Sequence, residues 1–229
     1  MLVVARRAVT CGTAALLTLG PPAWGLEKPP QGVASVNLSA DEVLVAILPA
    51  ARLVSVTQWA DAPGTSNVVG RVPPGVHRFV KADLEQLVAL RADLVVVSEY
   101  TDADFLRLVE RAGLRVHRMQ GLSSMAGVRA AILDLGRAVG EEAAARNLVA
   151  DFDATLRDLA ARLVGAHRPR ILYWSSGMTA GQHTGISALI EAAGGVNAGS
   201  ELGIVGIAPP GAERVFVADD TVALAPGAL

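Results

Sequence analysis

Cysteine and aromatic residues are scarce in this chain. Among 229 residues there is a single cysteine, Cys11, and aromatic side chains make up only 4% of the sequence. One thiol cannot close a disulfide within the chain, and by itself it cannot build a thiolate metal site. The fold must therefore depend on a hydrophobic core, which a chain of this length is able to bury.

An excess of charge of either sign is also missing. The sequence has 20 lysine and arginine residues against 22 aspartate and glutamate residues, for a formal net charge of -2. A nucleic-acid-binding surface needs a basic excess to neutralise phosphates, so we do not expect nucleic acid as a partner. Hydrophobic residues at 52% and charged residues at 18% are typical of a globular protein.

No hydrophobic run is long enough for stable membrane insertion, although the mean hydropathy is high at +0.41. The uncharged segment near the start, residues 8–24, is interrupted by Pro21 and Pro22. A spanning helix needs about 20 consecutive, predominantly apolar residues. The sequence therefore predicts no transmembrane helix.

The first residues have the order of an export signal. Arg6 and Arg7 precede an apolar stretch, and Ala23-Trp24-Gly25 supplies the small residues of a cleavage site. We therefore predict that residues 1–25 are an export signal and that the remaining chain is periplasmic. Cys11 lies inside this segment, so the exported part would contain no cysteine.

Signatures of the common enzyme classes are absent as well. The sequence has no G-x-S-x-G nucleophile elbow, no G-x-x-x-x-G-K-[ST] phosphate loop, no H-E-x-x-H motif and no G-x-G-x-x-G turn after a strand. We therefore predict that the chain is not an enzyme. An exported α/β enzyme is kept as an alternative, although no nucleophile and base can be assigned to it.

What is present is an alternation of strand and helix patterns. Short buried strands are predicted at residues 33–37, 53–57, 94–98 and 114–117. Helices are predicted at residues 40–48, 84–90, 102–112 and 125–139. Strands that alternate with helices form a parallel sheet covered on both faces. Residues 33–139 are therefore expected to form an α/β lobe.

A long amphipathic helix at about residues 141–163 separates this lobe from a second, shorter block. The predicted elements of that block are a strand at 170–174, a helix at 187–193, a short helix near 212–217 and an apolar run at 222–225. We assign residues 140–165 to a linking helix and residues 170–229 to a C-terminal lobe. An open parallel sheet needs more elements than this, so the C-terminal lobe is expected to be incomplete.

Four aromatic residues lie at or just beyond the predicted carboxyl ends of strands: Trp59, Tyr100, Tyr173 and Trp174. Ligands bind at these ends in open α/β sheets, and an aromatic ring there can stack on a planar or apolar ligand. Tyr173 can equally well pack in the core. The polar loop around Trp59 favours a binding role for that residue.

Two polar turns, one containing Asn37 and Ser39 and the other Ser175 and Ser176, offer hydroxyl and backbone N–H donors for an oxygen-rich ligand. The alternative for the first turn is helix capping by Ser39 or Asp41.

The four histidines are scattered, and none pairs with another at helical spacing. They are His77, His117, His167 and His183. A zinc or manganese site that combines His77 and His183 with a carboxylate is an alternative, although solvated or core histidines explain the pattern as well.

Glu85 and Glu213 occupy equivalent places in the two blocks, each at the start of a predicted helix. Singly, each is an ordinary first-turn acid that interacts favourably with the helix dipole. As a pair, they could bind two arginines of a partner protein.

Several of these segments together resemble the periplasmic substrate-binding proteins of ABC importers for cobalamin and ferric siderophores. The resemblance is carried by residues 36–42, 53–57, 83–96, 189–197 and 211–213, and by the order of long helix and second strand between them. It covers nearly the whole predicted exported chain.

The resemblance implies an α/β fold of two Rossmann-like lobes joined by one rigid helix, with the ligand held in the cleft between them. It implies no enzymatic activity and no cofactor, and its ligand would be a ferric siderophore, a corrinoid or a haem-like chelate. Trp59 matches a pocket aromatic residue, and residues 98–101, with Glu99 and Tyr100, match a pocket loop. Residues 174–178, with Trp174, Ser175 and Ser176, match another.

The resemblance also implies a partner, the ABC transporter permease. One surface glutamate of each lobe would dock on arginines of that permease, and these positions match Glu85 and Glu213. We expect the binding protein itself to be a monomer.

Overall fold

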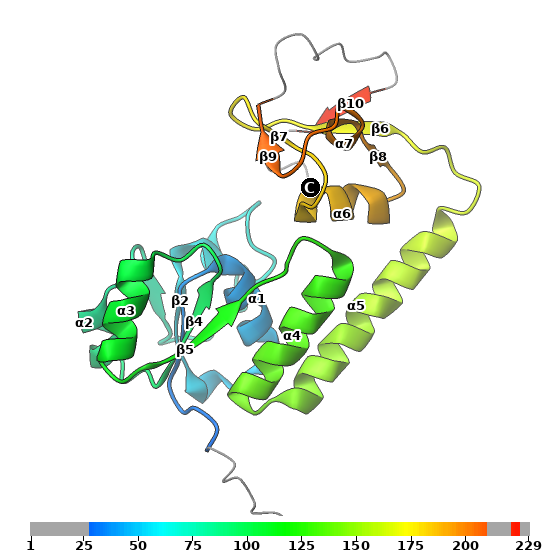
Figure 1. The fold of residues 1–229 in the computed structure, drawn as a ribbon. Helices are drawn as coiled ribbons and strands as arrows, with labels where there is room; N and C mark the ends of the chain where they lie inside the picture. The colour runs from blue at the N-terminus through cyan, green and yellow to red at the C-terminus, as the bar shows by residue number, and fades with distance from the viewer. Residues whose placement is uncertain (1–27, 210–220, 225–229) are drawn as a thin grey trace, which may run out of the picture.

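Five parallel strands form the centre of the first lobe in the computed structural model, which describes residues 28–209 and 221–224 (Figure 1). They are β1 (Val33–Ser35), β2 (Leu53–Thr57), β3 (His77–Phe79), β4 (Leu94–Ser98) and β5 (Arg115–Met119), in the spatial order β3-β2-β1-β4-β5. Four of the five were predicted. The edge strand β3 was not, because three residues with an exposed histidine at the start give no readable strand pattern.

Each helix of this lobe begins at a polar side chain that accepts a hydrogen bond from its first turn. The helices are α1 (Leu38–Ile47), α2 (Leu84–Ala89), α3 (Ala103–Arg111) and α4 (Met125–Val139), and their caps are Asn37, Asp83, Asp102 and Ser124. Two short 3₁₀ helices, η1 (Ala50–Arg52) and η2 (Gln58–Asp61), flank β2. The cap of α1 is therefore Asn37, and not Ser39 or Asp41 as the capping alternative supposed.

The core of the lobe is divided between the two faces of the sheet. One cluster, which includes Leu44, Val96 and Leu135, lies where α1, α4 and the long helix cover the sheet. The other, which includes Val95 and Val109, lies under α2 and α3. Successive residues of β4 thus point to opposite faces that are both buried, as expected for a parallel sheet.

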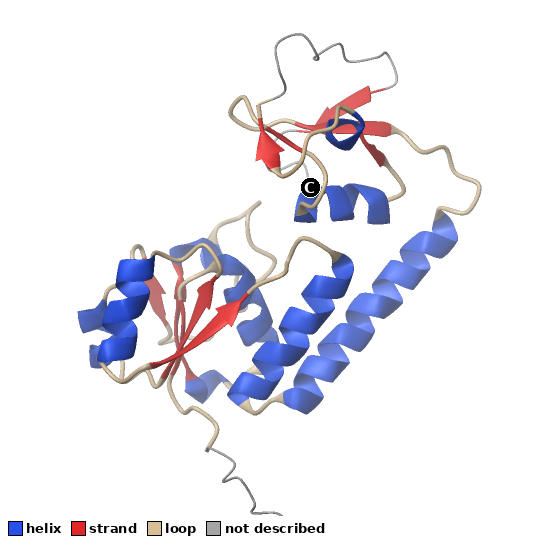
Figure 2. Cartoon of the chain, viewed as in Figure 1, coloured by secondary structure: helices blue, strands red, loops and turns tan. Residues whose placement is uncertain are grey.

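The long helix α5 (Glu142–Arg162) joins the two lobes (Figures 1 and 2). Its first half lies alongside α4, and its second half extends beyond the first lobe toward the second. A Cβ built on Gly136 of α4 would lie 2.3 Å from the Cβ of Ala145, so the two helices approach closely at this point. The predicted linking helix is confirmed.

The described residues of the second lobe form two small sheets. Its elements are β6 (Arg170–Tyr173), β7 (Thr179–Ala180), α6 (Gly185–Ala192), β8 (Val196–Asn197), α7 (Ala198–Glu201), β9 (Ile207–Ala208) and β10 (Thr221–Leu224). Strands β10-β6-β8 are parallel, and β7 pairs antiparallel with β9. The predicted helix near 212–217, Glu213 and the predicted export signal lie outside the described residues. In the part that is described, no helix is long and apolar enough to cross a membrane.

One arginine connects three segments at the base of the first lobe. Arg52 forms an ion pair with Glu141 at 2.6 Å, and it donates hydrogen bonds to the carbonyl oxygens of Pro30 and Val139. Its side chain is only 14% exposed. This arginine therefore holds two segments against the end of η1: the residues that precede β1, and the turn between α4 and α5.

We expect Arg52→Met to lower the free energy of unfolding by about 3 kcal/mol, because it leaves a carboxylate and two carbonyl oxygens without their donor. The matched control is Arg162→Met on α5, whose i,i+4 pair with Asp158 is exposed and should cost less than about 1 kcal/mol. Urea unfolding of both variants measures the difference. Equal losses would show that Arg52 is no more important than a surface arginine.

Candidate functional site

The order of the strands defines where a ligand can bind. Strands β1 and β4 are neighbours, and the chain leaves them toward opposite faces, through α1 and α3 respectively. In doubly wound sheets, ligands bind at the carboxyl ends of the strands at such a switch point. Asn37 is the second residue after β1, and Glu99 is the first residue after β4.

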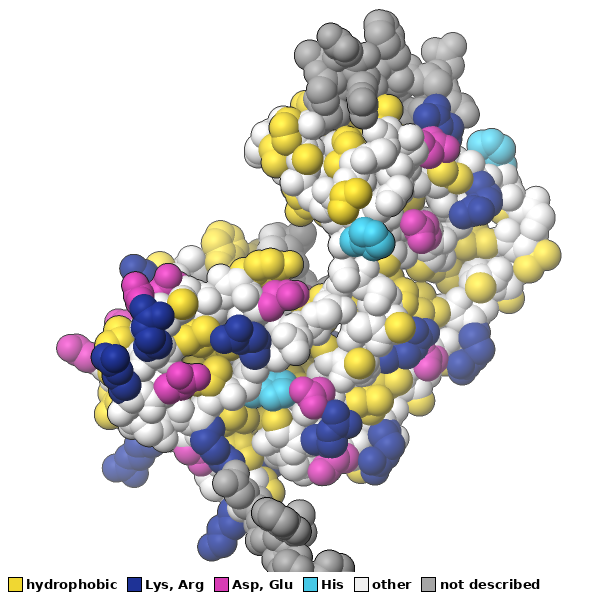
Figure 3. Space-filling model, in the orientation of Figure 1, with side chains coloured by type: hydrophobic (Ala, Val, Ile, Leu, Met, Phe, Trp, Pro, Cys, Tyr) yellow, Lys and Arg dark blue, Asp and Glu magenta, His cyan; other side chains and the backbone are white. Residues whose placement is uncertain are grey.

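A cleft of about 650 Å³ lies at this switch point, between the two lobes. The space-filling view shows the notch that separates the lobes (Figure 3). The first lobe lines the cleft where β1, β4 and β5 end and their loops begin, and the second lobe with the start of α6 and the start of β9. The lining residues are Asn37, Leu38, Ser39, Ser98, Glu99, Tyr100, Met119, Gly121, Leu122, Ser123, His183, Thr184, Gly185, Gly206 and Ile207. Its volume is within the range of sites for small molecules.

Four of the predicted ligand-binding residues line this cleft: Asn37, Ser39, Glu99 and Tyr100. The Oδ1 atom of Asn37 caps α1 by accepting from the N–H of Ala40 at 3.0 Å, while its buried Nδ2 has no partner among the described residues. The Tyr100 side chain is 88% exposed. Both residues line the cleft, but only Tyr100 presents an exposed side chain to it, because the Nδ2 atom of Asn37 is buried.

The other four predicted residues do not line the cleft. Trp59 lies on η2, after β2, one strand away from the switch point, and is 54% exposed. Trp174 is 38% exposed after β6, and Ser175 forms an isolated bridge with Met178 across a tight turn that contains Ser176. A ligand-binding role for these residues stays a prediction.

Two parts of the cleft lining were not predicted from the sequence. The loop after β5, with Met119 and Leu122, could have been found, because β5 lies beside β4 and ends at the same edge of the sheet. The contribution of the second lobe, with Thr184 and Ile207, could not, because it depends on how the two lobes face each other. For His183, the sequence suggested a metal ligand or a solvated or core histidine, and not a residue that lines the cleft.

A buried carboxylate lies beneath the first loop. Asp41 on α1 is fully buried, and its Oδ2 accepts hydrogen bonds from the backbone N–H and the hydroxyl of Thr57, at 3.1 and 2.6 Å. Burial raises the pKa of Asp41 to about 6, although the hydrogen bonds from Ser35 and Thr57 act in the opposite direction. The carboxyl group thus joins α1 to the end of β2.

The histidines do not assemble a metal centre in the part of the chain that the structure describes. His77 packs edge-on against Phe79, His167 is exposed after α5, and His183 lies at the cleft. Burial lowers the pKa of His117, which lies 3.6 Å from Asp134. No group of three or more histidine, cysteine, aspartate or glutamate residues is close enough to hold a metal ion there. The arrangement therefore gives the zinc or manganese alternative no support.

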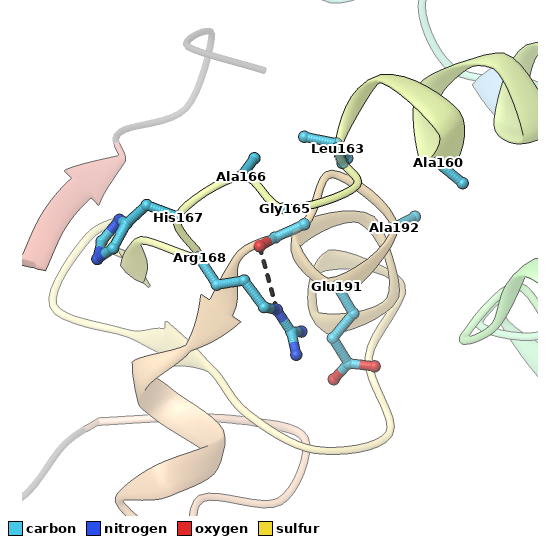
Figure 4. A pocket seen from close by; sticks show the side chains of 9 residues that line it. Ala160, Leu163, Gly165, Ala166, His167, Arg168, Glu191 and Ala192 are labelled. Atoms are coloured by element: carbon cyan, nitrogen blue, oxygen red, sulfur yellow. Dashed lines mark hydrogen bonds between the residues drawn. The ribbon is translucent and has the colours of Figure 1, made fainter.

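A smaller hollow of about 340 Å³ lies where α5 ends and the second lobe begins (Figure 4). Arg168, in the connection between α5 and β6, donates to the carbonyl oxygens of Gly194 and Gly195, at 3.3 and 3.0 Å. These carbonyls follow the end of α6, where a cation is favourable. Arg168 therefore holds the connection against the second lobe, away from the cleft.

Two α/β lobes joined by a single long helix, with a cleft at the switch point, define a solute-binding protein of the helical-backbone class. A family model described as periplasmic binding protein matches residues 33–224, and the chain belongs to this family. The family consists of solute-binding proteins and not of enzymes, and it implies an extracytoplasmic location.

Among curated proteins, the chain is similar to the cobalamin-binding protein of Halobacterium salinarum, with 29% identity over 202 residues. The match covers 85% of this chain and 53% of that protein, so the chain spans about half the length of the curated relatives it matches.

Solved structures share the fold. The periplasmic heme-binding protein of Roseiflexus sp. RS-1 matches with a TM-score of 0.62 and 25% identity, over 78% of this chain and 70% of that one. The periplasmic vitamin B12 binding protein of Vibrio cholerae matches with a TM-score of 0.65 and 21% identity, over 86% and 76%. The predicted fold of two Rossmann-like lobes joined by a long helix is thus confirmed.

The raised pKa of Asp41 leads to a prediction for stability. Because its pKa is higher in the folded state than in the unfolded chain, the folded protein loses stability as the pH rises from about 4 to about 6. A shift of about two units corresponds to about 3 kcal/mol. We expect Asp41→Asn to remove this part of the pH dependence, since the amide oxygen can still accept from Thr57.

Urea unfolding at pH 4, 5, 6 and 7 measures the effect as the difference between wild type and variant. Asp151→Asn, an exposed aspartate on α5, controls for the loss of one negative charge. Parallel pH profiles for wild type and Asp41→Asn would contradict the prediction.

Proposed function

We propose that this protein captures a metal chelate in the cleft between its lobes and delivers it to an ABC import permease. The observation that carries the proposal is the 650 Å³ cleft, because both lobes line it and it lies at the switch point of the larger sheet. Residues 1–25 would direct the chain to the periplasm.

The described lining favours a ligand without strong negative charge. Glu99 is the only residue with a fixed charge among the described residues that line the cleft. No arginine is among the described residues that line the cleft, and Arg78, for example, is paired with Asp61 instead.

Hydroxyl, amide and apolar groups make up most of the remaining lining, with Tyr100 as an exposed ring. A corrinoid fits this lining best, because it combines a broad apolar ring system with neutral amide arms. The relative named as a cobalamin-binding protein supports the same choice. A haem-like chelate and a ferric siderophore are the other two ligands to test.

Docking on the permease would use one acidic side chain from each lobe. Glu85 lies exposed in the first turn of α2, outside the residues that line the cleft. Glu213, its partner in the proposal, lies outside the described residues. An exposed carboxylate of this kind can pair with an arginine of the permease without disturbing the cleft.

A thermal melt of the full chain with cyanocobalamin, haemin, ferrichrome or zinc tests the proposed ligand class. A ligand that binds only the folded state stabilises it, so at a hundredfold excess over Kd we expect cyanocobalamin to raise Tm by about 5–10 °C. We expect Tyr100→Ala to weaken this binding about tenfold. Leu108→Ala, at an exposed position on α3 outside the cleft, should leave it unchanged.

A shift with zinc alone would favour the metal-ion alternative, and no shift with any chelate would refute the proposal. Trp59→Ala decides a separate question. A loss of affinity as large as that of Tyr100→Ala would extend the binding site to η2.

The docking role leads to a second test of the proposal. We expect the double variant Glu85→Arg, Glu213→Arg to bind its chelate with wild-type affinity and to lose transport, because like charges would then meet at the permease. Uptake of the labelled chelate into cells that carry the permease, beside titration of the purified variant, separates the two effects. If affinity fell as steeply as uptake, the docking role would be wrong.

A further inference from the structure

The two lobes meet backbone to backbone at one edge of the cleft. Gly185 is the first residue of α6, and a Cβ built on it would lie 2.9 Å from the carbonyl oxygen of Leu122 in the first lobe. Real Cβ atoms essentially never come so close to another heavy atom. Gly185 has an ordinary φ, so its backbone conformation would accept an alanine. Only the neighbouring lobe requires a glycine at this position.

The loop that carries Leu122 cannot move back into the first lobe. A Cβ built on Gly127, in the first turn of α4, would lie 1.8 Å from the carbonyl oxygen of Gly121. The hydroxyl of Ser124 also accepts a hydrogen bond from the N–H of Gly127, at 3.0 Å. The loop therefore rests directly on the backbone of α4, which is part of the packed core of the lobe.

The start of α6 is fixed on its other side in the same way. The hydroxyl of Thr184 donates to the carbonyl oxygen of Gly181 at 2.8 Å and accepts from the N–H of Ser187 at 3.1 Å. A Cβ built on Gly181 would lie 2.0 Å from the carbonyl oxygen of Ile204. Three close backbone approaches, at Gly127, Gly185 and Gly181, thus follow one another from α4 to the centre of the second lobe.

Leu122 and Gly185 both line the cleft, so the distance between them is also a dimension of the cleft. We propose that Gly185 is a spacer residue, which sets the separation of the two lobes and thereby the size of the ligand that the cleft accepts. A side chain at this position is expected to push the lobes apart, because each of the two backbones is packed against its own lobe. The consequence for the ligand rests on the proposed function, whereas the separation of the lobes does not.

The separation can be measured by pulsed EPR on the full chain with Cys11→Ser, which leaves no other cysteine in the sequence. Spin labels at Glu110→Cys on α3 and Ala193→Cys at the end of α6 report on one lobe each. We expect Gly185→Ala to shift or broaden the distance distribution, and Gly185→Val to change it further in the same direction.

The matched control is Gly203→Ala in the same lobe. Gly203 has a φ of +74°, and nothing lies within 4 Å of a Cβ built on it. The control variant therefore carries backbone strain without contacting the first lobe, and it should keep the wild-type distance even if its Tm falls. Unchanged distances in folded Gly185→Ala and Gly185→Val would overturn the proposal. A change as large in Gly203→Ala would overturn it too.

Ligand affinity supplies the second readout. If the wild type binds cyanocobalamin, we expect Gly185→Val to weaken binding about tenfold, as an overpacked contact does, and Gly203→Ala to retain it. Unchanged affinity in a Gly185→Val variant with separated lobes would overturn the link to ligand size. If the wild type binds none of the chelates, the proposed function fails, whereas the EPR distances still decide whether Gly185 is the spacer.

Discussion

The packing of α5 on α4 is the interaction on which the two-lobe shape depends. Close contact at Gly136 and Ala145 is followed along α5 by partly buried Leu148 and Val149. Further on, Arg129 of α4 forms an ion pair with Asp153 and lies over the ring of Phe152. Only after these contacts does α5 leave the first lobe. Because a helix held over half its length behaves as a stiff rod, the position of the second lobe follows from a contact made in the first.

The core residues that anchor α5 also position the binding loops. Leu135 and Val139 of α4 are fully buried, and the loop of Leu122 leads directly into the start of this helix. At the other end of α5, Arg168 fixes the connection to α6, whose first residue, Gly185, returns to the same loop. The two lobes are therefore connected twice: through α5 and the segment held by Arg168, and through the contact between Gly185 and Leu122. Relative motion of the lobes is thereby restricted at two separate points.

The sequence predicted the first lobe well, because its elements follow from local patterns. Strands β2 and β4 and helix α4 were predicted with the bounds that they have, since buried β-branched runs and helical periodicity are readable signals. The second lobe was harder, because its strands β7, β8 and β9 have two residues each and are too short to show periodicity. Their pairing depends on tertiary contacts that no local pattern records.

The same difference between local patterns and tertiary contacts explains which residues of the cleft could be predicted. Asn37 and Tyr100 follow strands, so the rule for carboxyl ends finds them. Without the order of the strands in the sheet, the rule cannot tell which strand ends lie at the switch point. Trp59 follows β2, which is one strand away from it. The rule cannot identify Gly185 at all. Its φ is ordinary, so the need for a glycine becomes apparent only when the position of the opposing lobe is known.

A cleft restricted in this way selects its ligand by shape and charge more than by closure. Little conformational entropy is lost on binding when the loops are already held in place, as the capped turn of Asn37 and the contact at Gly185 are. The cost is limited adaptability, because a larger ligand has to displace backbone rather than side chains. The exposed side chain of Tyr100 is then a group that remains free to respond to a ligand. If the protein binds a chelate as proposed, affinity would depend on side chains of the larger lobe, and discrimination by ligand size on the spacing of the two lobes.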